Sequence, residues 1–325
     1  MKAPFVWFGG KRRVADQVWT ALGDVDNYVE PFAGSLAVLL ERPHDMSDGH
    51  RRAETVNDAD GMIANFWRAL AHDPEAVAYH CDYPVNEVDL LARHLWLVNT
   101  GRSRLIEGME ADPEYFDARV AGWWVWGINA WIGSGWCSGA GPWEAVGDGT
   151  DRKLPHLGDA GRAGFNNLEY RPNVLDYFEA LAARLRDVRV CCGDWSRVCT
   201  TGALSFGTKV GVFLDPPYLG DVRTADLYAV DDHTISHEVR EWCLANGDNP
   251  RHRIVLAGYG PEHDHLIPDT WRRINWSSSA AYSTTKSAER QDGNHANRHT
   301  EVLWLSPHCV NPADDTPSLF DEVSS

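Results

Sequence analysis

Residues 212–218 have the sequence VFLDPPY, and this stretch decides the fold. Its apolar first half has the length and composition of a buried strand. The two prolines that follow cannot continue the hydrogen bonds of a strand, so they end it and stiffen the turn. The stretch therefore predicts a rigid corner at the carboxyl end of a strand, which is where open α/β sheets bind their ligands.

The corner offers groups that suit a planar ring with an exocyclic amino group. Asp215 is an anionic acceptor and Pro216 exposes a carbonyl oxygen, so together they can accept two N–H protons. Pro217 helps to hold the turn, and Tyr218 supplies an aromatic face on which the ring can stack. The simpler alternative is a strand followed by a proline-rich turn with one exposed tyrosine.

The composition favours a large globular chain in a reducing compartment. The formal net charge of the 325 residues is −17, which opposes indiscriminate binding to nucleic acid but does not exclude a nucleic-acid substrate. No apolar run approaches the roughly 20 residues of a membrane span, and we expect neither a membrane anchor nor a signal peptide. The seven cysteines contain no Cys-x-x-Cys pair, which favours reduced thiols and a cytoplasmic location.

Seven short apolar segments predict strands, and helical patterns lie between several of them. The predicted strands cover residues 28–29, 55–56, 188–191, 210–214, 254–257, 272–276 and 302–305. The predicted helices cover residues 35–41, 61–71, 174–186 and 236–245. Alternating strands and helices predict an α/β fold with a seven-stranded, mostly parallel, doubly wound sheet.

The alternation of strands and helices breaks between residues 74 and 171. This stretch is helical at first and then rich in glycine, tryptophan and polar residues, so we interpret it as an insertion. Residues 1–73 and 172–310 would form the sheet domain, and residues 74–171 the inserted region. Residues 311–325 are rich in proline and aspartate and are expected to form a flexible tail.

Four further features place polar groups beside other strands. In one of them Gly34 allows close approach to the backbone, and in another Asp58 can accept both hydroxyls of a ribose. Two alternatives stay open: Asp58 as a helix cap, and Asp194 with Trp195 as a cap and a core residue. The four features are the segment 5–11 (FVWFGGK), the turn 29–35 (VEPFAGS), Asn57-Asp58 and Gly193-Asp194-Trp195.

Together with the 212–218 corner, these features resemble in their order the Dam-type, D12-class DNA adenine N6-methyltransferases, over residues 4–305. The resemblance implies a Rossmann-like methyltransferase fold, S-adenosylmethionine as the cofactor and double-stranded DNA as the substrate. It also implies that the corner from Asp215 to Tyr218 holds a flipped adenine. The cofactor residues that it implies are Trp7, Gly10 and Lys11 (Lys11 at the carboxylate), Glu30, Phe32 and Gly34 (methionine portion), Asp58 (ribose), and Asp194 and Trp195 (adenine).

In this family the insertion carries target recognition. The tryptophan-rich segment 131–139 resembles a phage-like subgroup, which places the protein in a bacterial or phage-infected cell. We expect a monomer or weak dimer. The candidate DNA contacts are Arg102, Arg104, Trp136, Arg290 and Arg298.

Two departures from the family pattern concern the fit of the cofactor and the target sequence. Leu36 stands where the family usually has a second glycine, and Val6 stands where GATC-methylating relatives have lysine. An amino-methyltransferase acting on cytosine N4, RNA adenine or a glutamine amide stays open as an alternative, as does a catalytically silent DNA-binding or cofactor-binding module. The histidine pairs lack further ligands at matching spacing, so no metal is expected.

Overall fold

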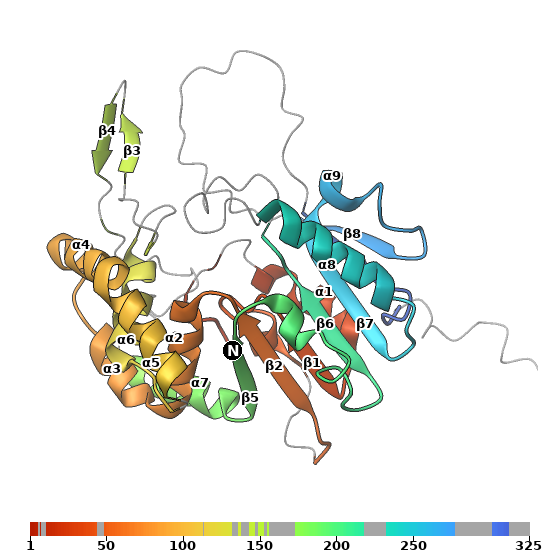
Figure 1. Cartoon of the computed structure of the whole chain (residues 1–325), viewed down its shortest axis with the longest axis horizontal. Helices are drawn as coiled ribbons and strands as arrows, with labels where there is room; N and C mark the ends of the chain where they lie inside the picture. The colour runs from red at the N-terminus through yellow and green to blue at the C-terminus, as the bar shows by residue number, and fades with distance from the viewer. Residues whose placement is uncertain are drawn as a thin grey trace, which may run out of the picture.

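The computed structural model describes residues 1–5, 7, 11–43, 49–112, 114–131, 136–137, 143–146, 149–152, 155, 173–217, 232–276 and 301–311. Its main sheet has seven strands in the order β5-β2-β1-β6-β7-β9-β8 (Figure 1). β9 runs antiparallel to β7 and β8, and the other neighbours are parallel. All the predicted strands are therefore confirmed. They are β1 (Asn27–Glu30), β2 (Ala53–Asp58), β5 (Val188–Cys192), β6 (Val210–Leu214), β7 (His252–Tyr259), β8 (Arg272–Trp276) and β9 (Glu301–Leu305).

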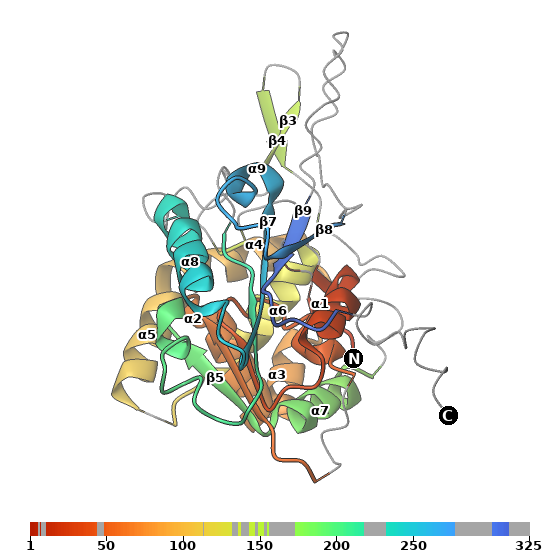
Figure 2. The ribbon, with the colours of Figure 1, turned by 90° about the vertical axis from the view of Figure 1, so that its right-hand side faces the viewer.

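Helices cover both faces of the sheet, and each face has its own hydrophobic core. Figures 1 and 2 show α1 and α8 on opposite faces. In β6, Phe213 packs into the first core, whereas Val212 and Leu214 pack into the second, as the two-residue period of a strand requires. The first core takes α1 (Ala15–Leu22), α2 (Gly61–His72) and α7 (Val174–Leu185), and the second takes η5 (Trp195–Val198) and α8 (Asp232–Asn246), with α9 (Gly260–His263) directly after β7.

The helix predicted over residues 35–41 is wrong for most of its length. Only Leu39–Glu41 form a short 3-10 turn (η2). Gly34 has a φ of +46° and Leu36 a φ of +56°, and two left-handed residues this close together prevent a helix from starting at Ser35. No helix N-terminus therefore lies at the described turn after β1.

The first part of the inserted region is helical, as expected. Its helices are α3 (Pro74–Cys81), α4 (Glu87–Trp96), a π-helical turn η3 (Leu97–Gly101), α5 (Arg102–Ala111) and α6 (Ala118–Ala130). α6 packs against α2 and α3, and Trp124 and Trp126 lie in the same core as Phe66. These tryptophans therefore belong to the main core, whereas the sequence suggests a small satellite core.

A short antiparallel hairpin follows the helices, formed by β3 (Trp143–Val146) and β4 (Gly149–Arg152). It projects beyond the helices in both views (Figures 1 and 2). No helix within the described ranges is both long and apolar enough to span a membrane.

Candidate functional site

Four neighbouring parallel strands carry acidic residues at or just after their carboxyl ends. The strands are β5, β2, β1 and β6, and the residues are Asp194, Asp58, Glu30 and Asp215. The register pairs Asp58 with Cys192 and Glu30 with Val56, so the strand ends lie close to one level. The carboxylates therefore share one edge of the sheet, as expected for a ligand site in an open α/β fold.

A small cavity of about 20 Å³ opens between the ends of β1 and β6. This volume is far below the ~300–1,000 Å³ of pockets that enclose a whole ligand, so the cavity can contact only part of one. Five of the predicted site residues line it: Trp7, Lys11, Glu30, Phe32 and Asp215. Among the residues that the structure describes, the lining consists of Trp7, Lys11, Glu30, Phe32, Ala33, Ser35, Ala37, Phe213 and Asp215.

Lys11 provides the cation of this cavity. Its ammonium nitrogen lies 3.0 Å from Asp215 Oδ1 and 3.5 Å from Glu301 Oε2. It also lies 5.4 Å from the centre of the Trp276 ring. Sequence reasoning missed Glu301 and Trp276. The signal for Glu301 was a lone charged residue at the start of the apolar run 302–305, which is unusual in a buried strand.

Glu30 is buried beside this ion pair. The Tyr28 hydroxyl donates a hydrogen bond of 2.9 Å to Glu30 Oε2. Burial raises the pKa of Glu30 to about 8; the Tyr28 hydrogen bond opposes this shift and the Asp215 charge adds to it. Glu30 is therefore mostly protonated at neutral pH, and the carboxylates that contact Lys11 are those of Asp215 and Glu301.

Gly34 lies against the ring of Trp7. A Cβ atom at Gly34 would come within 2.4 Å of Trp7 Cδ1, so glycine is required both for this contact and for the φ of +46°. The Gly34 N–H donates to Asp58 Oδ2 at 2.9 Å, and the Trp67 indole N–H donates to the Gly34 carbonyl at 3.0 Å. These contacts fix the 31–36 turn between the end of β1 and the end of β2.

Asp58 organises the end of β2. Its Oδ2 accepts the hydrogen bond from Gly34, and its Oδ1 accepts a 2.9 Å hydrogen bond from the Asp60 N–H. Burial raises the pKa of Asp58 to about 6, although the two N–H donors act in the opposite direction. The helix cap of α2 is Asp60, which accepts from the Met62 N–H at 2.8 Å. The alternative in which Asp58 caps this helix is therefore wrong.

Asp194 and Trp195 have the cap and core features that their alternative expects. Asp194 is exposed and accepts a hydrogen bond from the Ser196 N–H, which caps η5. Trp195 is buried, and its ring stacks on Phe32 with centroids 6.2 Å apart. Phe32 therefore connects the β5 end to the cavity that it lines.

The predicted DNA contacts are only partly described by the structure. Arg102 begins α5, and its guanidinium lies 3.9 Å from Asp60 Oδ2, while Arg104 on the same helix is exposed. Trp136 is half-buried, and its indole N–H donates to the Trp124 carbonyl at 3.0 Å. Four predicted site residues lie outside the described residues: Gly10, Tyr218, Arg290 and Arg298.

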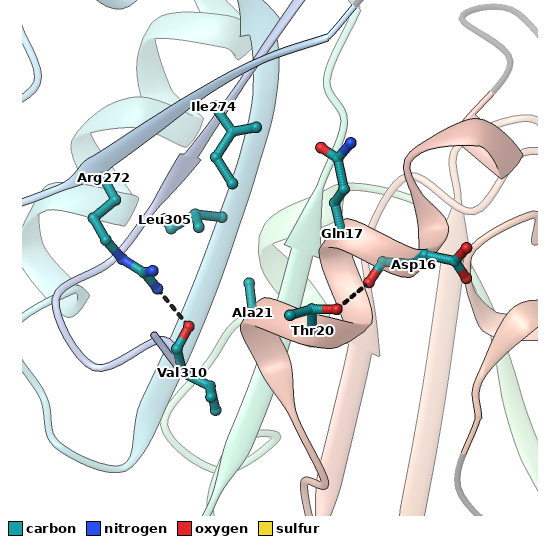
Figure 3. A pocket seen from close by; sticks show the side chains of 8 residues that line it. All are labelled: Asp16, Gln17, Thr20, Ala21, Arg272, Ile274, Leu305 and Val310. Carbon is teal, nitrogen blue, oxygen red and sulfur yellow. Dashed lines mark hydrogen bonds between the residues drawn. The ribbon is translucent and has the colours of Figure 1, made fainter. Parts of the chain in front are cut away.

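A larger cavity, of about 190 Å³, lies away from these strand ends (Figure 3). It is formed between α1 and the β8–β9 edge, and Ala21, Ile274 and Leu305 line it. Arg272 at its rim donates hydrogen bonds to the Val310 and Cys309 carbonyls, so its guanidinium fastens the chain after β9. None of the predicted site residues lines this cavity, and we therefore place the site at the smaller one.

Metal chemistry and disulfides find no support in the residues that the structure describes. There, no group of three or more His, Cys, Asp or Glu side chains could hold a metal ion. All seven cysteines fall within these ranges, and each is a free thiol.

The amino-terminal quarter of the chain matches a known family. Residues 7–92 match the family model of the D12 class N6 adenine-specific DNA methyltransferases. This segment contains Lys11, Glu30, Phe32, Gly34 and Asp58. No curated protein sequence matches the chain. This match supports the predicted family and the predicted enzyme class, and the sheet agrees with the Rossmann-like methyltransferase fold. The phage-like subgroup stays a prediction.

Proposed function

We infer that this chain is an adenine-specific DNA methyltransferase of the D12 class. On this premise, we propose that it transfers a methyl group from S-adenosylmethionine to N6 of an adenine flipped out of duplex DNA. One observation carries the inference. Lys11, Glu30 and Asp215, which are far apart in the sequence, line one cavity at the ends of β1 and β6.

The side chains around the cavity suit each part of the cofactor. The Lys11 ammonium is the group that a cofactor carboxylate would pair with. Trp7 and Phe32 present aromatic rings, which attract a sulfonium cation. Asp58 uses one acceptor site on each oxygen for Gly34 and Asp60, and each oxygen has a further lone pair for a ribose hydroxyl.

The β5 end would receive the cofactor's adenine. We assign its amino group to the exposed Asp194 carboxylate. Trp195 stacks on Phe32 and supports the wall on which the adenine would rest. Trp7 is held against Gly34, so the opposite end of the site is fixed before a ligand arrives.

The corner after β6 would act on the substrate base. When bound, S-adenosylmethionine supplies an electrophilic methyl group on a positively charged sulfur. Asp215 and the Pro216 carbonyl accept the two amino hydrogens of adenine and so make the N6 lone pair more available. Tyr218 would stack on the base, as the sequence predicts.

The same residues would stabilise the transition state. Positive charge would develop on N6 as the new C–N bond forms and the bond from sulfur to the methyl carbon breaks, with S-adenosylhomocysteine as the leaving group. The Asp215 carboxylate would stabilise that positive charge electrostatically. The surplus N6 proton leaves to Asp215 or to water, which restores a neutral methylated amine. Alignment of nitrogen, methyl carbon and sulfur supplies the remaining acceleration.

Access to N6 requires the base to leave the duplex, which costs a few kcal/mol of unstacking. Arg102 and Arg104 on α5, with Arg290 and Arg298, are the proposed phosphate contacts, and Trp136 is a proposed stacking contact. Local basic side chains are needed because the net charge of −17 repels DNA. We place the protein in the cytoplasm, as a monomer or weak dimer.

Nucleoside analysis tests this function. Duplex DNA would be incubated with the protein and S-adenosylmethionine carrying a labelled methyl group, and then digested to nucleosides. We expect label in N6-methyldeoxyadenosine. Label in N4-methyldeoxycytidine would support the cytosine alternative, and no label in DNA would leave the RNA, glutamine-amide and silent-module alternatives.

A further inference from the structure

Lys11 is nearly buried between two carboxylates. Its side chain is 7 % exposed, and that of Glu301 is 6 % exposed. Burying an ammonium is unfavourable unless it is paired, and the contacts at 3.0 Å and 3.5 Å provide that pairing. The Lys11 ammonium thus lies between two carboxylates beside the cavity.

The fold fixes Glu301 where it can hold Lys11. Glu301 begins β9, which lies between β7 and β8, and it pairs with Tyr259 on one side and Trp276 on the other. Its backbone is therefore held by both neighbours. The Trp276 ring also faces the Lys11 ammonium, at 5.4 Å. The ammonium is thus restrained from the β8–β9 side as well as by Asp215.

We propose that Glu301 is a positioning residue that shares the Lys11 ammonium and so leaves Asp215 able to accept hydrogens from the substrate amino group. The proposal rests on the proposed function, in which Asp215 contacts the base. A carboxylate held tightly by an ammonium is a poorer acceptor for a second donor. Because Glu301 takes part of the pairing, Lys11 can stay in place while Asp215 binds the base.

Replacing Glu301 with glutamine keeps the size of the side chain and removes its charge. In Glu301→Gln, Lys11 would pair more fully with Asp215 and compete with the amino group, which slows methyl transfer. The loss of a negative charge would also favour the cofactor carboxylate at Lys11, so cofactor affinity is kept or increased. Rate and affinity therefore respond differently, whereas general damage to the site would lower both.

The first experiment measures both quantities on the full chain. S-adenosylmethionine affinity is obtained from tryptophan fluorescence, and the transfer rate from single turnovers on duplex DNA. We expect Glu301→Gln to lower the rate at least tenfold with Kd unchanged or lower, and Glu301→Asp to recover part of the rate. A rate within twofold of the original, or parallel losses of rate and affinity, would overturn the proposal.

A matched control is Glu262→Gln. Glu262 is also a buried glutamate, on α9, but it accepts a hydrogen bond from Ser236 and does not line the cavity. This variant should keep the rate and Kd within twofold of the original values. A tenfold loss of rate in the control as well would assign the Glu301→Gln result to general damage and overturn the proposal.

A second experiment needs neither cofactor nor DNA. The free energy of unfolding is measured for Lys11→Met, Glu301→Gln and the double variant. Lys11→Met leaves the buried Glu301 carboxylate without its cation, and the double variant removes that carboxylate as well, so it should lose less stability than the sum of the singles. Additive losses would overturn the pairing. Failure of the unaltered protein to methylate adenine would instead count against the proposed function.

Discussion

At the scale of single residues, Leu36 shows how a departure from the family pattern is accommodated. It has a φ of +56°, yet its side chain is fully buried in the first core. Left-handed backbone costs a non-glycine residue about 1–2 kcal/mol. Burial of the side chain contributes about 1.5–3 kcal/mol, which offsets that strain. Leucine can therefore stand in place of glycine here, because the burial of its side chain offsets the strain of its left-handed backbone.

Substitutions at Leu36 test this balance through the free energy of unfolding. Leu36→Ala should cost about 2–5 kcal/mol, since it loses the packing and keeps the strain. Leu36→Gly should cost no more than Leu36→Ala, because glycine removes the strain. The control is Val18, which is buried in the middle of α1, where glycine should be about 1 kcal/mol worse than alanine. If glycine destabilised the chain more than alanine at both positions, the account would be contradicted.

Glu30 predicts a particular dependence of stability on pH. Its pKa rises from 4.5 to about 8 on folding, so between these values the folded chain holds a proton that the unfolded chain has released. Its contribution is fully present below pH 4.5 and is lost as pH rises towards 8. Glu30→Gln keeps an acceptor for Tyr28 and cannot ionise. Between pH 5 and pH 8 its free energy of unfolding should fall by roughly 1–3 kcal/mol less than that of the unaltered protein. The free energy of unfolding would be measured by urea titration at several pH values. If it changed equally with pH in both proteins, the raised pKa of Glu30 would be refuted.

At the scale of secondary-structure elements, Asn65 joins α2 to the start of α6. Its side-chain amide donates to the Asp117 carbonyl at 3.0 Å and accepts from the Asp117 N–H at 2.9 Å. Asp117 in turn caps α6 by accepting from the Val120 N–H. The helical part of the insertion is thereby fastened to the sheet domain by polar contacts as well as by the shared core.

Removing this amide should destabilise the chain measurably. Asn65→Ala leaves two buried backbone groups without their partner, and we expect a loss of about 2–4 kcal/mol in the free energy of unfolding. Asn86→Ala, at the exposed cap of α4, should cost about 1 kcal/mol. If urea unfolding gives the two variants equal losses, the contact does not fasten the insertion as described.

The elements differed in how far the sequence could predict them. The run at 210–214 is wholly apolar, is preceded by Lys209 and is followed by Asp215 and two prolines, so β6 could be predicted with its correct ends. The turn after β1 could not, because the positive φ angles of Gly34 and Leu36 prevent a helix there. The position of Lys11 between Asp215 and Glu301 was also out of reach, since the strand order that brings them together is not a local property.

At the scale of the whole molecule, the strand order assembles the site. β1 and β6 are central neighbours but lie about 180 residues apart, and the cavity opens where their ends meet. On one side of it, β2 and β5 extend the acidic edge to Asp58 and Asp194. On the other side, β9 brings Glu301 to Lys11. The side formed by β1, β2 and β5 would thus hold the cofactor, and the corner after β6 would hold the substrate base.

This division of labour predicts separate effects on binding and transfer in Asp215→Ala. Transfer should fall by at least about 100-fold, because the group that opposes the developing charge is lost. Cofactor affinity should change little, because Lys11 keeps Glu301 as a partner.

The most direct test is to measure S-adenosylmethionine binding and single-turnover methylation of adenine on the same preparation of Asp215→Ala. Retained binding with lost methylation is the result we predict. Methylation near the original rate, or loss of binding and methylation together, would contradict the assignment of the corner after β6 to the substrate base.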